Sequence, residues 1–228
     1  MSRIYRGGIY LLGVVLLILG ITFNVKAGLG VSPITSISFS PSEIWGISLG
    51  ITTFGVYCIL TVVQIIVVGR LRPTEWLQLP ASVGFSALLD YFLKIIPYDC
   101  ASESFLLNCS IMIVSIVLTG AGVALMANMQ LLLTPADGVV YTLAWRVGRE
   151  MGLVKNIVDV ACVMLTCLFG LVFAGEIVGI GIGTLVAMIG TGRVIALVNK
   201  FGRERMRRMA GLDSTMAKPV PRSREAVE

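Results

Sequence analysis

Thr134-Pro-Ala-Asp-Gly138 follows Ser32-Pro-Ile-Thr-Ser36 by 102 residues. The same interval joins several further pairs: Gly20 and Gly122, Pro33 and Pro135, Gly46 and Gly148, Gly50 and Gly152, and Ser82 and Thr184. An interval that preserves glycine, proline and hydroxyl positions indicates an internal duplication, as in many transporters. We therefore predict a first repeat over residues 1–104, a second over 105–200, and a basic cytoplasmic tail over 201–228 that is disordered.

The composition places this chain in a membrane. Hydrophobic residues make up 56% of the sequence and charged residues 14%, with a mean hydropathy of +0.91. A soluble chain of this length could not bury so much apolar surface. Six apolar stretches approach the length of about 20 residues that crosses a bilayer: Ile9–Val25, Ile47–Val68, Leu77–Ile96, Phe105–Ala127, Val154–Ala174 and Ile177–Val198. We predict an all-α polytopic membrane protein with six transmembrane helices.

Lysine and arginine indicate the orientation of these spans. A cytoplasmic N-terminus leaves only Lys26 and Lys94 on the outer side. The inner side then receives Arg3, Arg6, Arg70, Arg72, Arg146, Arg149, Lys155 and the tail that begins at Lys200. We expect both termini in the cytoplasm of a bacterium, with the spans in its inner membrane. Three spans per repeat is an odd number, so the two repeats must be inverted.

The net charge of +5 needs no nucleic-acid partner. Basic residues gather directly after the last span, where they would contact anionic lipid headgroups on the cytoplasmic face. They are Lys200, Arg203, Arg205, Arg207 and Arg208.

A short segment follows the first span of each repeat, near residues 27–43 and 130–148. Both are too apolar for ordinary loops and too short, or too interrupted by proline, for full spans. Ser32 and Thr134 suit the N-cap of a helix, with Pro33 and Pro135 at its first position. We predict two short re-entrant helices, the alternative being amphipathic helices that lie in the membrane interface.

The starts of these helices are the candidate solute site. A helix N-terminus carries free N–H groups and a partial positive charge, so two of them facing one cavity would favour a small polar or anionic solute. Asp137 is the candidate for binding a cation or proton beside that solute. The predicted site residues are Gly30, Ser32, Pro33, Thr35, Thr134, Pro135, Asp137 and Gly138.

Charged residues inside the apolar stretches are costly and usually functional. Asp90 either forms an ion pair with Lys94 one turn later or couples transport to a proton or cation. Asp159 is the second candidate for coupling, although it lies only about one turn inside the fifth span and hydration would also explain it. Arg193 is expected to extend toward the cytoplasm.

Catalysis has little support, so we expect no enzyme and no cofactor. The chain has no histidine and no nucleotide-binding or nucleophile motif. Gly179, Gly181 and Gly183 are interpreted as close helix packing within the last span.

The cysteines do not predict a metal site. Cys58, Cys162 and Cys167 have no ligand-like spacing. Cys100 and Cys109 flank the outer loop, and either a disulfide or two thiols would fit there.

Four segments resemble the bacterial YczE/YyaS/YitT family of small integral membrane proteins. They are Gly28-Leu-Gly-Val-Ser-Pro33, Leu77-Gln-Leu-Pro80 followed by Asp90, Thr134-Pro-Ala-Asp-Gly138 and Gly181-Ile-Gly-Thr184. The resemblance spans about residues 5 to 200 and implies a polytopic membrane protein. Family members often have Trp-Asp after the first proline, whereas this chain has Ile34-Thr35 there and keeps an acid only at Asp137.

Two classes of function follow. The first is a secondary transporter, or less favourably a channel, for a small polar or anionic solute. Water channels are disfavoured because their proline motifs follow the second and fifth spans, whereas these follow the first and fourth. The second class is a membrane scaffold or regulator without transport. Small-residue helix faces would also allow a homo-oligomer.

Overall fold

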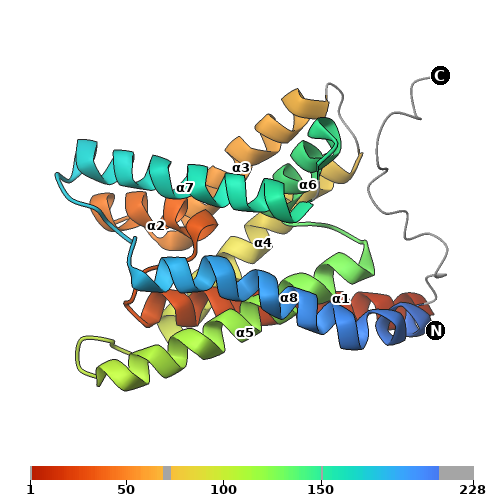
Figure 1. Cartoon of the computed structure of the whole chain (residues 1–228), viewed down its shortest axis with the longest axis horizontal. Helices are drawn as coiled ribbons and strands as arrows, with labels where there is room; N and C mark the ends of the chain where they lie inside the picture. Colours follow the sequence, from red (N-terminus) through yellow and green to blue (C-terminus); the bar gives the residue numbers. More distant parts are fainter. Residues whose placement is uncertain (1, 69–72, 150, 211–228) are drawn as a thin grey trace.

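The helices repeat with the same interval as the sequence. The computed structural model describes residues 2–68, 73–149 and 151–210, and this part of the chain forms eight helices and no strand. In chain order they are α1 (Ser2–Lys26), α2 (Pro33–Trp45), α3 (Leu49–Val68), α4 (Pro73–Ile95), α5 (Phe105–Met129), α6 (Pro135–Val147), α7 (Met151–Phe173) and α8 (Ile182–Met209), as Figure 1 shows. Adding 102 to the bounds of α2 gives the bounds of α6.

The two short helices have matching ends, and Ser32 and Thr134 occupy the predicted N-cap positions, although only the Thr134 side chain makes a capping hydrogen bond. Ser32 and Thr134 have extended backbones with φ of −60° and −61°, and each precedes a proline at the first turn. Gly46 and Gly148 end the helices with φ of 64° and 65°. Glycine adopts this left-handed conformation without a steric penalty, so it stops both helices after the same number of residues.

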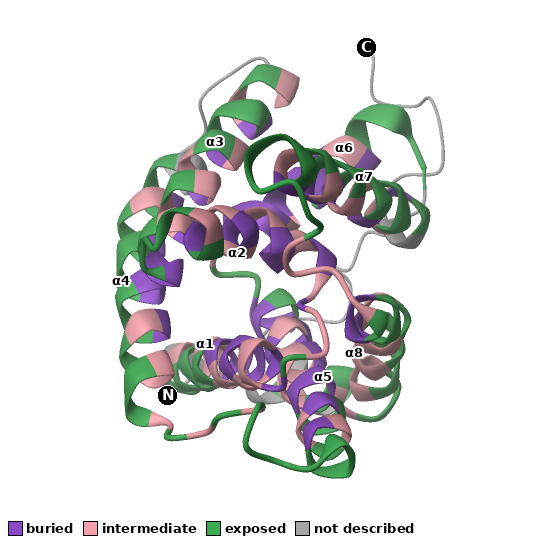
Figure 2. Cartoon of the chain, turned by 90° about the vertical axis from the view of Figure 1, so that its left-hand side faces the viewer, coloured by how far each residue is buried: buried purple, intermediate pink, exposed green. Residues whose placement is uncertain are grey.

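The helices are polar inside and apolar outside. On α3, the buried residues include Thr53, Tyr57, Thr61 and Gln64, whereas Ile59 is exposed. Figure 2 shows exposed residues along the outer faces of the helices and buried ones toward the middle. This polarity is expected where lipid, rather than water, covers the outer surface. The protein is therefore assigned to the membrane.

Five helices are long and apolar enough to cross a bilayer: α1, α3, α5, α7 and α8. The remaining predicted span corresponds to α4, which has 23 residues. This helix is less apolar because it contains Gln78 and Ser82, both buried, and Asp90. Five candidate spans are thus established, and the sixth depends on α4.

The first helices of the two repeats cross antiparallel. Arg6, near the start of α1, donates hydrogen bonds to the carbonyl oxygens of Met129 and Gln130 at the end of α5. Near the other end of α1, Asn24 donates to Ser115 in the first half of α5. Between them, Gly20 and Gly122 form the crossing.

Neither of these glycines has room for a side chain. A Cβ on Gly122 would lie 2.6 Å from the Leu17 backbone nitrogen, and a Cβ on Gly20 would overlap the Thr119 side chain. The crossing therefore brings the two backbones into direct contact, in the manner of small-residue helix pairs in membranes.

The helices divide into two groups. A scaffold group consists of α1, α4, α5 and α8, in which α5 packs on α1 and α8, and α4 packs on α1. A core group consists of α2, α3, α6 and α7. In this group α2 packs on α7 and α6 packs on α3, so each short helix contacts the other repeat (Figure 1). Both groups contain equivalent helices from each repeat.

The contact between the groups is unequal in the two repeats. Along its length α4 packs against α3, whereas the equivalent helix α8 barely touches α7. Asp90 accounts for part of this difference. Its carboxylate accepts hydrogen bonds from the Gly50 N–H at 2.7 Å and the Ser48 hydroxyl at 2.8 Å, both at the start of α3. The equivalent residue on α8 is Gly192, which has no side chain to bond with.

The last span begins later than predicted. Residues 177–181 are apolar but not helical, and α8 starts at Ile182. This strand-like segment hydrogen-bonds with the segment before α2, because Val31 donates to the Gly179 carbonyl and Gly183 donates to the Leu29 carbonyl. The interpretation as helix packing was therefore wrong for Gly179 and Gly181, which precede α8, whereas Gly183 lies in α8 and packs closely against the Leu29 and Gly30 backbone. Gly179 has φ of 83°, which a helix does not allow.

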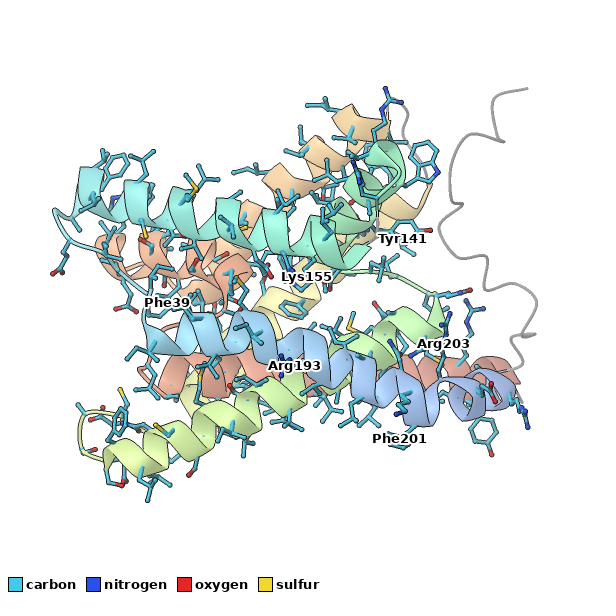
Figure 3. The ribbon with its side chains drawn as sticks, viewed as in Figure 1. Phe39, Tyr141, Lys155, Arg193, Phe201 and Arg203 are labelled. Atoms are coloured by element: carbon cyan, nitrogen blue, oxygen red, sulfur yellow. The ribbon has the colours of Figure 1, made fainter. Side chains whose placement is uncertain are left out.

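The other end of α8 also differs from the prediction. The helix continues to Met209, so residues 201–209 of the predicted disordered tail are helical. Residues 211–228 lie outside the described part of the chain, as do Arg70 and Arg72. Arg193, which was expected near the cytoplasmic end, is exposed near the middle of α8 (Figure 3).

We predict that Gly122→Ala destabilises the fold, because the new Cβ would overlap the α1 backbone. Overpacking of this kind costs about 1–3 kcal/mol, so the thermal midpoint in detergent should fall. Gly55→Ala on α3 is the matched control, since nothing lies within 4 Å of its Cβ position. Equal midpoints for the two variants would contradict the close crossing of α1 and α5.

Candidate functional site

The start of α6 carries the acid of the predicted site. The Thr134 hydroxyl accepts a hydrogen bond from the Asp137 N–H at 3.2 Å and donates to the Asp137 carboxylate at 2.8 Å. A carboxylate in the first turn is stabilised by the positive end of the helix dipole. Asp137 therefore supplies from within the chain the negative charge that this helix end attracts. Thr134 and Pro135 are buried beside it.

Two glutamines face the same helix end from α3 and α4. If Gly138 carried a Cβ, this atom would lie 2.7 Å from the Gln64 Oε1 atom and 3.1 Å from the Gln78 Nε2 atom. Glycine at this position is what lets both amides approach the first turn of α6. Both side chains are buried, with exposed fractions of 8% for Gln64 and 4% for Gln78.

An ion pair lies on α7 between the two short helices. The Lys155 ammonium is 3.3 Å from the Asp159 carboxylate one turn later, and Asp159 is only 2% exposed. Asp159 is thus buried and paired, and the expectation that it is hydrated near the membrane surface was wrong. In Figure 3, Lys155 lies between α2, marked by Phe39, and α6, marked by Tyr141.

The start of α2 is held by residues of α1 and α7. The Ser32 N–H donates to the Asn24 carboxamide at 2.7 Å, and the Ser32 hydroxyl pairs with Thr35 at 2.8 Å. One turn later, Ser36 pairs with Thr166 of α7, also at 2.8 Å. At this helix start, hydrogen bonds within the chain therefore satisfy the Ser32 N–H and the hydroxyls of Ser32, Thr35 and Ser36.

Asp159 connects the two helix starts. Seven residues separate it from Thr166 on α7, which corresponds to about 10 Å along a helix. Asp137 lies close enough to interact electrostatically with Asp159 and with the buried Tyr57 of α3. Tyr57 and Asp159 are equivalent positions in the two repeats.

Not all predicted site residues gather at this centre. Gly30 lies against the start of α8, where a Cβ would be 2.8 Å from the Thr184 hydroxyl. Asp90 lies at the other end of α3, and the partners of its carboxylate are Ser48 and Gly50 rather than the predicted Lys94.

Comparison with known families gives a match for nearly the whole chain. The profile of DUF6198, described as a family of unknown function, matches residues 4–200. This protein belongs to the DUF6198 family. No curated protein and no solved structure matches the chain. The family carries no name that links it to the YczE/YyaS/YitT proteins that the sequence resembles.

In this DUF6198 protein, acidic side chains outnumber basic ones at the site. The carboxyl groups of Asp137 and Asp159 and the ammonium group of Lys155 lie here. The free N–H groups at the helix starts are also few. Pro33 and Pro135 have no N–H, and Asn24 and Thr134 accept from two others.

Metal binding and a disulfide find no basis in the described residues. Within 2–68, 73–149 and 151–210, no three cysteine or acidic side chains gather closely enough to hold a metal ion. Cys100 and Cys109 are separate thiols. Cys100 lies against Gly28 instead.

Four residues that contact the starts of α2 and α6 were not among the predicted site residues: Asn24, Gln64, Gln78 and Thr166. Each is a single polar residue within a long apolar stretch, which composition alone treats as part of a span. The interval of 102 residues was a usable signal, because it pairs Gln64 with Thr166 and Gly138 with Ser36. The contact of α3 with α6 thus has the same register as the contact of α7 with α2.

We predict that Asp159→Asn destabilises the protein, because it leaves the Lys155 ammonium partly buried without a counter-charge. Breaking a buried pair costs about 3–5 kcal/mol, and the low end applies because Lys155 remains 26% exposed. A double change, Lys155→Met with Asp159→Leu, should restore the thermal midpoint. Glu204→Gln, in an exposed pair with Arg208, is the control and should have no effect. An unchanged midpoint in Asp159→Asn would contradict a structural ion pair.

Proposed function

We propose that the protein is a secondary transporter for a small polar solute, built from two inverted repeats. The observation that carries the proposal is the antiparallel crossing of α1 and α5. When two membrane-spanning helices cross antiparallel, the two-fold axis that superimposes one on the other is perpendicular to both helices. This axis therefore lies in the plane of the membrane. Transporters with this symmetry bind their solute near the bilayer midplane, between the repeats.

The short helices support this arrangement. Each packs on the long helix of the other repeat, α2 on α7 and α6 on α3. Trp45 at the end of α2 packs on Phe169 and Phe173 near the end of α7. Since Ser36 contacts Thr166, α2 begins farther inside than it ends. We infer that α2 and α6 are re-entrant helices with their N-termini near the midplane and that α4 is the sixth span.

The unequal contact of the two groups supports alternating access. In inverted-repeat carriers, exchanging the conformations of the repeats converts an outward-facing state into an inward-facing one. Here the α3–α4 contact is closed and fastened by Asp90, whereas the equivalent α7–α8 contact is slight. We infer that α3–α4 opens when α7–α8 closes. Asp90 then acts as a latch, while Asp137 and Asp159 couple transport to a proton or cation.

Charge gives the orientation. Arg203 lies near the end of the molecule where α1 begins (Figure 3), and Arg6 belongs to the first turns of α1. The loop between α4 and α5, which contains Asp99 and Glu103, lies at the opposite end (Figure 1). With the basic end in the cytoplasm, the N-terminus is inside. The proposed location is a bacterial inner membrane, with the basic end of α8 against anionic lipid.

Flux through proteoliposomes tests the proposed function. The purified protein should accelerate uptake of at least one solute from a panel of amines, amino acids, sugars and small anions. Asp137→Asn should abolish that uptake, because it removes the charge at the start of α6. Asp99→Asn in the outer loop is the control and should retain uptake. If no solute enters faster than in protein-free vesicles, the proposal fails and the scaffold alternative is favoured.

The latch makes a separate prediction. Asp90→Asn should weaken the bonds to Ser48 and Gly50 and open the α3–α4 contact more often. A cysteine at Thr53, buried on α3 in the wild type, should then react several-fold faster with a water-soluble maleimide. The same cysteine in an Asp99→Asn background is the control. Equal reaction rates would contradict the latch.

A further inference from the structure

Buried polar atoms without a partner gather on two helices. In the described part of the chain, four such oxygen atoms lie on α3 and α4: Thr53 Oγ1, Gln64 Oε1, Gln78 Oε1 and Ser86 Oγ. A fifth, Ser40 Oγ, lies on α2. An unsatisfied buried acceptor costs about 1–3 kcal/mol. Thr53 and Gln64 are about 16 Å apart along α3, so the unpaired oxygens do not form a single group. Gln64 and Gln78 do lie together, because both side chains contact Gly138, and unpaired buried acceptors there indicate a place where a hydrogen-bond donor binds.

The two glutamines point to the first turn of α6. If Gly138 carried a Cβ, this atom would lie 2.7 Å from the Gln64 Oε1 atom and 3.1 Å from the Gln78 Nε2 atom, so both amides lie against the same residue of α6. Asp137, the residue before Gly138, brings a carboxylate to this turn. Gln64 presents its Oε1 atom to this turn and Gln78 its Nε2 atom, and the Oε1 atoms of both side chains are buried without a partner. The place thus combines two buried carboxamides with a nearby carboxyl group.

The equivalent place in the other half is closed. There, Ser36 stands at the position of Gly138 and Thr166 at the position of Gln64. These two hydroxyls bond with each other at 2.8 Å, so both are satisfied within the chain. The duplication therefore kept a structural contact on α2 and α7. At the equivalent positions on α6 and α3, the chain has Gly138 and Gln64, and the Gln64 amide oxygen is unpaired.

We propose that Gln64, Gln78 and Asp137 bind a small cation that donates hydrogen bonds, of the ammonium class. This inference rests on the proposed function, since it names the solute class of the same site. The two carboxyl groups of Asp137 and Asp159 outnumber the ammonium group of Lys155 and favour a cation. The unpaired amide oxygens favour N–H donors, because a cation without N–H groups leaves both acceptors unsatisfied. The same carboxyl groups disfavour the anionic solute expected from the helix dipoles alone.

Thermal unfolding of the purified protein tests binding without requiring transport. Methylammonium chloride should raise the unfolding midpoint saturably, as any ligand of the folded state does. Tetramethylammonium chloride has the same charge and no N–H donor, and it should leave the midpoint unchanged at equal concentration. Sodium chloride controls for ionic strength. An equal rise with sodium, or no rise with methylammonium, would overturn the proposal.

Variants locate the effect. Gln64→Leu and Gly138→Ala should each remove at least nine-tenths of the methylammonium shift, the first by deleting an acceptor and the second by filling its approach. Without ligand, Gln64→Leu should unfold no earlier than the wild type, because it removes an unpaired buried oxygen. Asn199→Leu removes a half-buried amide that accepts a hydrogen bond from Asn128, and it should keep the shift. A full shift in Gln64→Leu would overturn the proposal.

Uptake of radiolabelled methylammonium into proteoliposomes separates this inference from the proposed function. A Gln64-dependent midpoint shift without uptake supports the binding site and defeats the transporter. Uptake of another solute with no methylammonium shift defeats the ammonium site and leaves the transporter standing. Uptake that Gln64→Leu abolishes supports both.

Discussion

The close antiparallel crossing of α1 and α5 is the contact on which the rest of the structure depends. Gly20 and Gly122 lie at this crossing, and a Cβ on either would enter the backbone or side chain of the other helix. Arg6 fixes the direction by binding the last carbonyls of α5. In the proposed inverted repeat, the opposite directions of the first helices bring the N-termini of α2 and α6 to the middle of the membrane.

Polar groups then accumulate where the short helices meet the long ones. Lipid favours an apolar exterior, so the chain's few charges and amides are turned inward and must find partners there. Asn24 bonds with the start of α2, Thr166 with its first turn, and Lys155 with Asp159. Gln64 and Gln78 are exceptions that lie together, since their oxygens, like those of Ser40, Thr53 and Ser86, have no partner among the described residues. These two glutamines mark the place that we assign to a solute.

Much of this fold follows from sequence by local physics. Ser32-Pro33 and Thr134-Pro135 predicted the helix starts, because capping and proline act within one turn. The start of α8 was missed, since residues 177–181 are as apolar as a span and only their bonds with the segment before α2 keep them extended. Asp90 was paired with Lys94 by spacing along one helix, whereas its partners lie across the α3–α4 contact. A single sequence does not show which residues of different helices or segments will contact each other, so these two contacts could not be predicted.

The central claim is that equivalent positions of the two repeats face opposite sides of the membrane. Ile47 and Arg149 are such a pair, separated by 102 residues, and both are exposed just after the short helices. Single cysteines there, in a variant whose five native cysteines are replaced, can be labelled in intact cells with an impermeant maleimide. The account predicts labelling of Ile47→Cys from outside and labelling of Arg149→Cys only after lysis. Labelling of both variants in intact cells, or of neither, would contradict the inverted repeat.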